Sequence, residues 1–463
     1  MAMAETMRFK LPGFKGALMH PGDTGYDDAR KVHNGMIDRR PALIARCKTA
    51  DDVVLAVNLA RREGLPLSVY GGGHGVTGAA VCEAGVVVDL RGMKGADVDP
   101  KARTIRAEAG LNWGEFDAAT QAHGLAMTGG RNPTTGISGL VLGSGSGWLE
   151  RKFGFACDNL FKAEVVTADG RKVMASETEN PDLLWGLKGG GGNFGIVTAF
   201  HFRLYPLGPM ILGGLMLYPA AMARDVVRFW RDFMTKAPDE IGGALIFMTA
   251  PPAPFVPEAA RSKPMLGMLL AYAGPVAEGE AALKPLRTFG PPVVDLIQPM
   301  PYVALQGFTE EGNPKGIQNY WTADFFKGLP DEAIDVLVAH ATRLTSPMNV
   351  VIVVPGGGAV ARVDENATAI GQRNAPFNIH YLSTWLDPKD DALNIASTRA
   401  TAAAMKPWAT GRVYLNYIGD EGEARIEGSF GKEKLAKLRA LKRKWDPENL
   451  FRHNQNIRPA EAA

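Results

Sequence analysis

The sequence predicts an α+β protein of two domains, and three observations support this prediction. Over residues 1–206, short apolar runs alternate with helical patterns and glycine clusters. Over residues 207–409, longer apolar strands alternate with helices. Residues 410–463 are too short and too polar to form a core alone, so we expect them to return to the first domain.

The first domain is expected to contain short elements separated by turns. Thr49 and Asp52 form a typical N-terminal cap for a helix over 50–63, which Gly64 would end. The other expected elements are strands over 65–69, 85–90 and 104–109, a helix over 113–123, and a hairpin over 163–175 that turns at Asp169-Gly170.

The second domain is expected to be built from a sheet and helices. Strands are predicted over 211–219, 265–274, 348–357 and 377–386, with helices over 226–235 and 278–289. A last strand, "GRVYLNYIG" at 411–419, should precede a basic amphipathic helix over 432–445.

The composition excludes several classes of protein. The formal net charge is +2, which gives no electrostatic reason to expect a nucleic-acid partner. Cys47, Cys82 and Cys157 are odd in number and lack a CxxC spacing, so neither a disulfide framework nor a metal site is expected. The N-terminus lacks an apolar signal-peptide core, and no apolar run reaches the roughly 18 residues that span a bilayer. We therefore expect a cytoplasmic protein without a membrane partner.

The glycine-rich stretch "SVYGGGHGVTG" at 68–78 is the most distinctive part of the chain. Gly73, Gly75 and Gly78 match a literal GxGxxG, but another strand, not a helix, follows them, so a nicotinamide-type crossover is disfavoured. Two more glycine clusters follow, "GISGLVLGSGSGWL" and "WGLKGGGGNFG". None ends in the Lys-Ser/Thr of a P-loop, which counts against ATP hydrolysis. A long dinucleotide ligand cradled by backbone is the natural candidate, and tight turns are the alternative.

The order of the motifs resembles a known family over nearly the whole chain. These motifs include "GGGHG", "TTGISGLVLGSGSGWLERKFGFACDNL", "PDLLWGLKGGGGNFGIVT", "YLNY" and "WDPENLFRHNQNI". They resemble the vanillyl-alcohol-oxidase type of flavin-linked oxidoreductase with a PCMH-type FAD-binding domain. Within it they are similar to the berberine-bridge-enzyme-like branch and its bacterial 6-hydroxynicotine oxidases. The resemblance implies FAD as cofactor and an antiparallel sheet in the second domain.

The resemblance also implies one covalent bond between FAD and the ring of His74. Some family members form a second bond through a cysteine about 60 residues later. Asn132 stands at that place here, so a single link is expected, and Cys157 is interpreted as a buried structural thiol. A histidine that is merely hydrogen-bonded in a turn is the alternative for His74.

Further positions at the cofactor follow from the same resemblance. Ile137 stands where the family controls access of dioxygen to the flavin, so the electron acceptor is left open. Tyr70 and Gly75 depart from the arginine and asparagine common in the family. The implied cofactor-binding residues are Tyr70, Gly71, Gly72, Gly73, His74, Gly75, Asn132, Thr134, Thr135, Ile137, Gly139, Gly143, Gly145, Gly147, Gly195, Ile196, Val197, Asn454 and Asn456.

The expected strand at 411–419 would carry the central catalytic residues. Alternation along a strand would place Tyr414 and Asn416 on one face and Tyr417 on the other. Similar proteins direct this tyrosine and asparagine at the flavin, and we predict that Tyr414 removes a substrate proton. Because a free tyrosine has a pKa near 10, Tyr414 would need nearby donors or positive charge to ionise. A core tyrosine with a satisfied hydroxyl is the alternative.

Other side chains are expected around Tyr414. Asn378 and His380 would share one face of their strand, and His380 is a second candidate base or a structural hydrogen-bonding residue. Tyr320 and Trp321 are expected to line a substrate pocket, with core packing as the alternative.

These observations predict an FAD-dependent oxidoreductase that takes hydride from a C–OH or C–N carbon of a small molecule. Dioxygen or another acceptor would then reoxidise the flavin. A nicotinamide-dependent dehydrogenase and a noncatalytic flavin-binding protein are the alternatives. The sequence does not indicate an oligomeric state.

Overall fold

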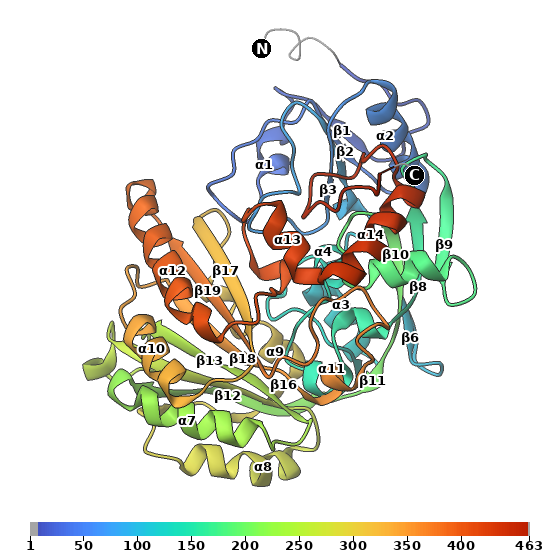
Figure 1. Ribbon diagram of the computed structural model, residues 1–463. Coiled ribbons are helices and arrows are strands. Elements are labelled where there is room, and N and C mark those ends of the chain that lie inside the picture. The colour runs from blue at the N-terminus through green and yellow to red at the C-terminus, as the bar shows by residue number, and fades with distance from the viewer. Residues whose placement is uncertain (1–7, 462–463) are drawn as a thin grey trace.

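The computed structural model describes residues 8–461 and has an α+β fold, as the sequence predicts (Figure 1). Its strands form three main sheets, and a two-stranded ribbon pairs β7 (Leu125–Ala126) with β11 (Tyr205–Pro206). The α-helices are α1 (Tyr26–Arg30), α2 (Ala50–Arg62), α3 (Trp113–Gln121), α4 (Ile137–Leu142), α5 (Glu150–Phe153), α6 (Pro181–Leu187), α7 (Ala223–Met234), α8 (Val276–Thr288), α9 (Tyr302–Gln306), α10 (Asp331–Ala341), α11 (Gly358–Arg362), α12 (Asp391–Met405), α13 (Glu423–Phe430) and α14 (Lys432–Trp445).

The first sheet carries the glycine-rich loop at one strand end. It contains β1 (Ala17–Met19), β2 (Leu43–Arg46), β4 (Val86–Asp89) and β3 (Leu67–Tyr70), in that order. β3 and β4 run parallel, with Leu67 opposite Val86. The connection between them, 71–85, contains no helix, so the GxGxxG match does not form a nucleotide-binding crossover.

The second sheet supports the other glycine clusters. It is antiparallel, in the order β5 (Ala96–Asp99), β6 (Thr104–Glu108), β10 (Ile196–Arg203), β8 (Leu160–Val166) and β9 (Lys172–Ser176). β8 and β9 form the hairpin that the Asp169-Gly170 turn predicts. The short helix α4, part of the second glycine cluster, precedes this hairpin in the chain.

The third sheet has eight antiparallel strands and provides one wall of the candidate site. Seven run in the order β15 (Val294–Asp295), β12 (Met210–Pro219), β14 (Pro264–Tyr272), β13 (Ile241–Thr249), β18 (Val350–Pro355), β19 (Phe377–Trp385) and β17 (Gln318–Phe326), while β16 (Gln298–Pro301) also pairs with β12. α12 contacts β17 and β19 on one side, and α13 and α4 lie beyond the other side in the view of Figure 1.

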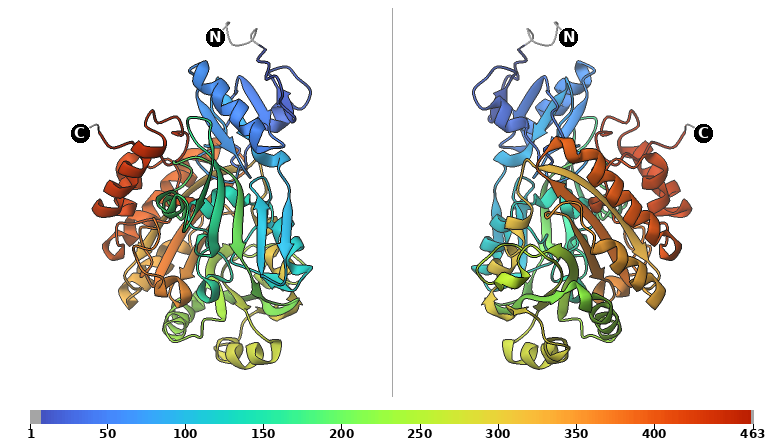
Figure 2. Two further views of the ribbon diagram at one scale, coloured as in Figure 1. Left: turned by 90° about the vertical axis from the view of Figure 1, so that its right-hand side faces the viewer. Right: turned by 90° about the vertical axis from the view of Figure 1, so that its left-hand side faces the viewer.

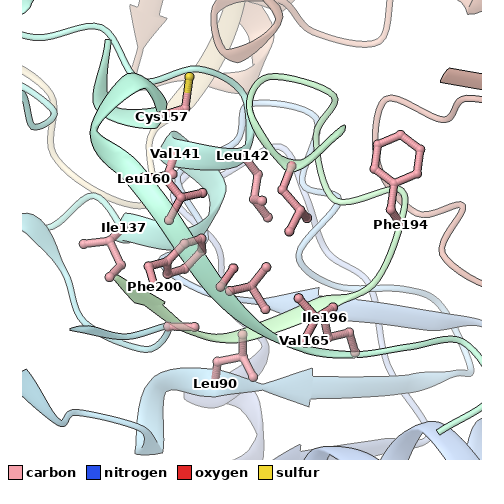
Figure 3. Packing of buried hydrophobic residues seen from close by; sticks show 14 of the residues in the cluster. Leu90, Ile137, Val141, Leu142, Cys157, Leu160, Val165, Phe194, Ile196 and Phe200 are labelled. Carbon is pink, nitrogen blue, oxygen red and sulfur yellow. The ribbon is translucent and has the colours of Figure 1, made fainter. Parts of the chain in front are cut away.

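Separate apolar cores underlie these sheets. One cluster combines the first two sheets with C-terminal residues such as Phe430, Leu438 and Trp445, and part of it is drawn in Figure 3. A second combines the third sheet with α7, α8, α10 and α12. The C-terminal helices lie beside the N-terminal half in Figures 1 and 2. The division at 1–206, 207–409 and 410–463 stays a prediction.

The expected strand at 411–419 is not formed, and this prediction was wrong. Leu415–Tyr417 form a single 3-10 turn, and Tyr414 precedes it in an extended conformation. The apolar and aromatic residues of this segment match strand propensity, but their side chains reach hydrogen-bond and ring partners on other elements. Tertiary contacts therefore override the local preference.

Candidate active site

Two of the glycine-rich segments touch backbone to backbone. A Cβ atom added to Gly72 would lie 2.1 Å from the amide nitrogen of Gly136, and one added to Gly71 would lie 2.1 Å from Oγ of Ser138. A side chain at Gly72 cannot be accommodated without separating the loops, whereas one at Gly71 would displace the Ser138 hydroxyl. The loop after β3 is therefore fixed against the N-terminus of α4.

His74 lies in this loop beside the threonines of the second segment. Its Nε2 is 2.9 Å from Oγ1 of Thr134, and its Nδ1 is 3.4 Å from Oγ1 of Thr135. The ring of His33 stacks on it with centroids 4.4 Å apart. Burial, followed by the nearby His33, lowers the pKa of His74 to about 3. The imidazole is therefore neutral at pH 7, and one of its ring nitrogens carries a lone pair in place of a proton.

The neighbours of His74 hold the loop in shape. Asn132 accepts hydrogen bonds from the amide and the hydroxyl of Thr134, at 3.0 and 2.7 Å. The Tyr70 hydroxyl donates to the carbonyl of Lys31 at 2.7 Å, and the Arg91 guanidinium lies 3.7 Å from the Tyr70 ring centroid. Tyr70 thus packs against the loop, where a Cβ at Gly73 would lie 2.5 Å from its hydroxyl oxygen. Gly75 is exposed, and a Cβ there would meet nothing within 4 Å.

The loop after α4 holds the hydroxyl of Tyr414. This oxygen accepts hydrogen bonds from the amides of Gly145 and Ser146, at 3.0 and 2.7 Å, and from Nδ2 of Asn416 at 3.2 Å. No acceptor for the Tyr414 O–H is present among residues 8–461. Burial raises the pKa of Tyr414, while the Ser146 amide and Asn416 act in the opposite direction.

Tyr417 lies on the same side as Tyr414, so its expected opposite placement was wrong. The two tyrosine rings have centroids 4.5 Å apart, and Tyr417 stacks on His380 at 4.1 Å with an interplanar angle of 1°. The 3-10 turn is the physical reason, because it does not alternate side chains as a strand does.

β19 brings Asn378 and His380 to this cluster, as their spacing predicts. Asn378 lies at the cavity described below, and His380 contacts Tyr417 and Trp321. Nε2 of His380 and Oδ1 of Asn378 are buried without a hydrogen-bond partner. Burial, followed by the charge of Arg131, lowers the pKa of His380 to about 3.

The predicted pocket aromatics are split between two faces of β17. Trp321 is buried beside His33 and His380, with ring centroids 6.4 and 5.4 Å away. The Tyr320 hydroxyl instead accepts a hydrogen bond from Nε of Arg399 on α12, at 3.0 Å. Trp321 therefore belongs to the cluster around His380, and Tyr320 faces away from it.

A cavity opens in front of Tyr414, and charged residues that the sequence did not single out line it. Glu150 and Arg373 lie in its wall with Asn378 and Tyr414. Arg131, close behind, donates to the Tyr417 hydroxyl at 3.3 Å and lies 3.8 Å from a Glu150 oxygen. The sequence did offer one signal for Arg131, because this cationic residue stands next to Asn132 and between two glycine clusters.

Other predicted cofactor residues lie in or near the core. Ile137, Ile196 and Val197 are buried in the large cluster, and Cys157 lies among its apolar side chains in Figure 3. A Cβ at Gly195 would lie 2.5 Å from Val165, and one at Gly147 1.9 Å from the carbonyl oxygen of Gly129. A Cβ at Gly139 would meet open space.

The C-terminal amides leave acceptors unused. Nδ2 of Asn454 donates to the carbonyl of Gly192 at 3.0 Å, in the third glycine cluster. The Oδ1 atoms of Asn454 and Asn456 are buried without a partner. Unpaired buried amide oxygens suit a ligand that offers N–H or O–H donors, as the ring system and ribityl chain of FAD do. The residues present fit this cofactor.

The comparisons with known proteins agree with this geometry. Residues 41–176 match the family model described as FAD binding domain, and residues 413–458 match the one described as berberine and berberine like. An FAD-linked oxidoreductase of Dictyostelium discoideum is 28% identical over 452 residues, 96% of this chain and 95% of its own. The (R)-6-hydroxynicotine oxidase of Paenarthrobacter nicotinovorans is 28% identical over 96% of this chain and 97% of its own.

Solved structures show the same architecture. The crystal structure of 6-hydroxy-D-nicotine oxidase from Arthrobacter nicotinovorans has 27% identity and a TM-score of 0.87, with 96% of this chain and 98% of that chain covered. A chitooligosaccharide oxidase, at 23% identity and a TM-score of 0.84 over 96% and 98% of the two chains, shares the fold.

The fold and the matched segments define an FAD-linked oxidoreductase. The chain belongs to the superfamily in which an FAD binding domain is joined to a berberine-like C-terminal segment. The nicotinamide and noncatalytic alternatives find no support. Within residues 8–461, no helix is long and apolar enough to cross a membrane, and no group of His, Cys, Asp or Glu is arranged to hold a metal ion.

Proposed function

We propose that this enzyme oxidises a small molecule at a carbon that bears a hydroxyl or amino group. When bound, FAD supplies the two-electron acceptor for the hydride. The observation that carries the proposal is the Tyr414 hydroxyl, which three N–H groups hold at the edge of a cavity. The names of the similar oxidases, which mention nicotine derivatives and oligosaccharides, support a small-molecule substrate.

Tyr414 is proposed to take the proton that leaves the substrate hydroxyl or amine. The three N–H donors would stabilise negative charge on its oxygen, in the manner of an oxyanion hole, whereas burial opposes that charge. Asn416 positions this oxygen. His380 is the second candidate, because its unpaired Nε2 can accept a proton.

His74 is proposed as the single covalent attachment point of FAD. Its neutral ring supports this role, since the attacking nitrogen must be unprotonated. Asn132 offers no thiol for a second bond, and Cys157 is fully buried in apolar packing. Dioxygen or another acceptor would reoxidise the flavin, and the fully buried Ile137 is proposed to control dioxygen access.

The first experiment compares the flavin of purified wild-type protein with that of a His74→Ala variant. Each protein is acid-precipitated and washed, and the pellet is analysed by absorption and mass spectrometry. We expect yellow colour and the added mass of one FAD in the wild type only. His123→Ala is a matched control, because His123 is exposed in the turn that follows α3.

Each outcome bears on a separate statement. Flavin retained covalently by the His74→Ala variant would contradict attachment at His74 and the single link. A wild type that binds flavin but releases all of it in acid would contradict covalent attachment and leave the FAD-dependent reaction standing. A pellet carrying two FAD-linked sites would contradict only the single link.

A further inference from the structure

Gln455 of the C-terminal segment reaches the turn that follows Tyr414. Its Nε2 donates a hydrogen bond of 2.6 Å to the carbonyl oxygen of Leu415, the next residue along the chain. Within residues 8–461, this is the only hydrogen bond that joins the backbone of residues 413–418 to another segment. The backbone beside the candidate base is therefore fixed by the side chain of a residue 40 positions away.

The backbone of Gln455 is in turn fixed by Asn193 in the third glycine cluster. Nδ2 of Asn193 donates to the carbonyl oxygen of Gln455 at 3.2 Å, and its Oδ1 accepts from the amide of Ile457 at 3.0 Å. Asn193 is 1% exposed, and hydrogen bonds in such an environment are electrostatically stronger than in water. One amide side chain therefore fixes the peptide groups on both sides of Asn456.

A buried ion pair stabilises this junction. Nζ of Lys442 donates to the carbonyl oxygens of Asn193 and Phe451, at 2.9 Å each, and to Oδ2 of Asp446 at 2.7 Å. Both charged side chains are fully buried. Burial of a charge is costly unless it is paired and hydrogen-bonded, and here three acceptors match the three N–H donors of the ammonium group. The segment around Gln455 is therefore a firmly held support for the turn.

The residues on either side of Gln455 belong to the candidate cofactor site. Nδ2 of Asn454 donates to the carbonyl of Gly192, and the buried Oδ1 atoms of Asn454 and Asn456 have no partner. These two oxygens suit the donors of FAD, whereas the side chain of Gln455 is bonded to Leu415. The C-terminal segment thus joins the third glycine cluster to the backbone beside Tyr414.

We propose that Gln455 is a positioning residue, which sets the place of the Tyr414 hydroxyl through the carbonyl of Leu415. The inference rests on the proposed function, in which Tyr414 takes the substrate proton. Without this bond the turn can shift, and the Tyr414 oxygen then loses its alignment with the amides of Gly145 and Ser146. Because a carbonyl oxygen only accepts, the role requires an N–H donor at the end of the Gln455 side chain.

Hydrogen exchange of the flavin-loaded enzyme, followed by mass spectrometry, tests this role without a substrate. The amides of Gly145 and Ser146 are bonded to the Tyr414 oxygen, so their exchange reports whether that contact is intact. Gln455→Met keeps the length of the side chain but removes its donor. We expect it to speed exchange of the two amides by about two- to tenfold, the range for loss of one hydrogen bond. Tyr414→Phe, which lacks the accepting oxygen, gives the reference for complete loss.

Two further variants separate hydrogen bonding from packing. Gln455→Glu keeps the size of the side chain but places a carboxylate against the Leu415 carbonyl, so its effect should exceed that of Gln455→Met. If Gln455 only filled space, both variants would exchange as the wild type does. Gln298→Met makes the matched change at an exposed glutamine of β16 and should leave the exchange unchanged.

The rate constant of flavin reduction provides the functional measurement. With the alcohol or amine that the wild type oxidises, it should fall at least fivefold in Gln455→Met and further in Gln455→Glu, while flavin content stays as in the wild type. The inference is overturned if both variants keep wild-type exchange at Gly145 and Ser146, or if exchange rises equally throughout the molecule. If exchange changes as expected but Gln455→Met and Tyr414→Phe both reduce flavin at the wild-type rate, the positioning role stands and Tyr414 is not the base.

Discussion

Nδ2 of Asn416 donates a hydrogen bond of 3.2 Å to the hydroxyl oxygen of Tyr414, and the same side chain fills the space beside Gly143. A Cβ atom at Gly143 would lie 2.0 Å from Oδ1 of Asn416. The amide also donates to the carbonyl of Leu140 at 3.1 Å. The glycine at the end of α4 therefore determines where Asn416, and through it Tyr414, can lie.

Gly143→Ala should move Asn416 and lower activity. Asn416 is half-buried, and leaving such an amide without its partners costs about 1–3 kcal/mol at most, so we expect a loss of stability of up to this order. We expect kcat/KM to fall at least tenfold because the Tyr414 hydroxyl loses one donor. Steady-state kinetics and urea unfolding of the purified variant measure the two effects.

Gly428→Ala is the control for this substitution. Gly428 lies in the exposed part of α13, and a Cβ there would meet nothing within 4 Å. Alanine in a helix interior should leave activity unchanged and stabilise by up to about 1 kcal/mol. If Gly143→Ala and Gly428→Ala lose equal amounts of activity and stability, the contact between Gly143 and Asn416 does not position Tyr414.

Activity should depend on pH in a way that separates the two candidate bases. Burial raises the pKa of Tyr414, so a reaction that needs its ionised form should accelerate with pH through the neutral and alkaline range, by up to about tenfold per unit. Burial lowers the pKa of His380 to about 3, so a reaction that needs only neutral His380 should be independent of pH above about 5.

The measurement is the pH profile of kcat/KM for wild type, Tyr414→Phe and a control. We expect Tyr414→Phe to be slow and to lose the alkaline rise. Tyr205→Phe should keep the wild-type profile, since Tyr205 stacks on Phe153 through its ring. If kcat/KM of the wild type is instead independent of pH above 5, and His380→Ala loses this activity, the base is His380.

Local sequence signals predicted the parts of the fold that local contacts fix. The helix α2, Ala50–Arg62, forms because the Thr49 hydroxyl accepts from the Asp52 amide at 3.2 Å and the Asp52 carboxylate accepts from the Thr49 amide at 3.1 Å. The hairpin at Asp169-Gly170 has equally local causes, with Gly170 at a φ of 83°.

The arrangement of the candidate site depends on contacts between residues far apart in the sequence, and local sequence patterns could not predict it. Tyr414 lies where it does because the amides of Gly145 and Ser146, more than 260 positions earlier, donate to it. Arg131 joins the site through Tyr417 in the same way. The roles of Tyr414 and Asn416 were predicted from the resemblance to a family. The alternation of apolar and polar residues along the chain did not indicate them.

Gly72→Ala should separate the two loops around His74. Its Cβ would lie 2.1 Å from the Gly136 amide nitrogen, and backbone must move to relieve this contact, at a cost of about 1–3 kcal/mol or more. We expect reduced flavin content, measured as the absorbance ratio of flavin to protein, and a lower unfolding temperature.

Gly75→Asn serves as its comparison, because a Cβ at Gly75 meets nothing within 4 Å. This variant should fold with a wild-type unfolding temperature. A Gly72→Ala protein with full flavin content and unchanged stability would show that the close contact between the loops is not required.

The free energy of unfolding should fall as the pH rises, because the buried carboxyl of Asp117 then ionises. This carboxyl is buried between α3 and α9, where Oδ2 accepts from Nε2 of Gln306 at 2.7 Å and Oδ1 has no partner. Burial raises the pKa of Asp117 from 3.8 to about 7. Between these two values the folded state binds more protons than the unfolded state, so stability falls as pH increases from 4 to 7, by about 1–4 kcal/mol.

Asp117→Asn should remove this dependence, since an amide cannot ionise and its oxygen can still accept from Gln306. Urea unfolding at pH 5 and pH 8 gives the comparison: the wild type should lose stability between the two, and the variant should lose less and be the more stable protein at pH 8. Asp97→Asn, at a mostly exposed carboxylate, controls for the change in net charge. Equal pH dependence in wild type and Asp117→Asn would mean that Asp117 is already ionised in the folded protein at pH 5.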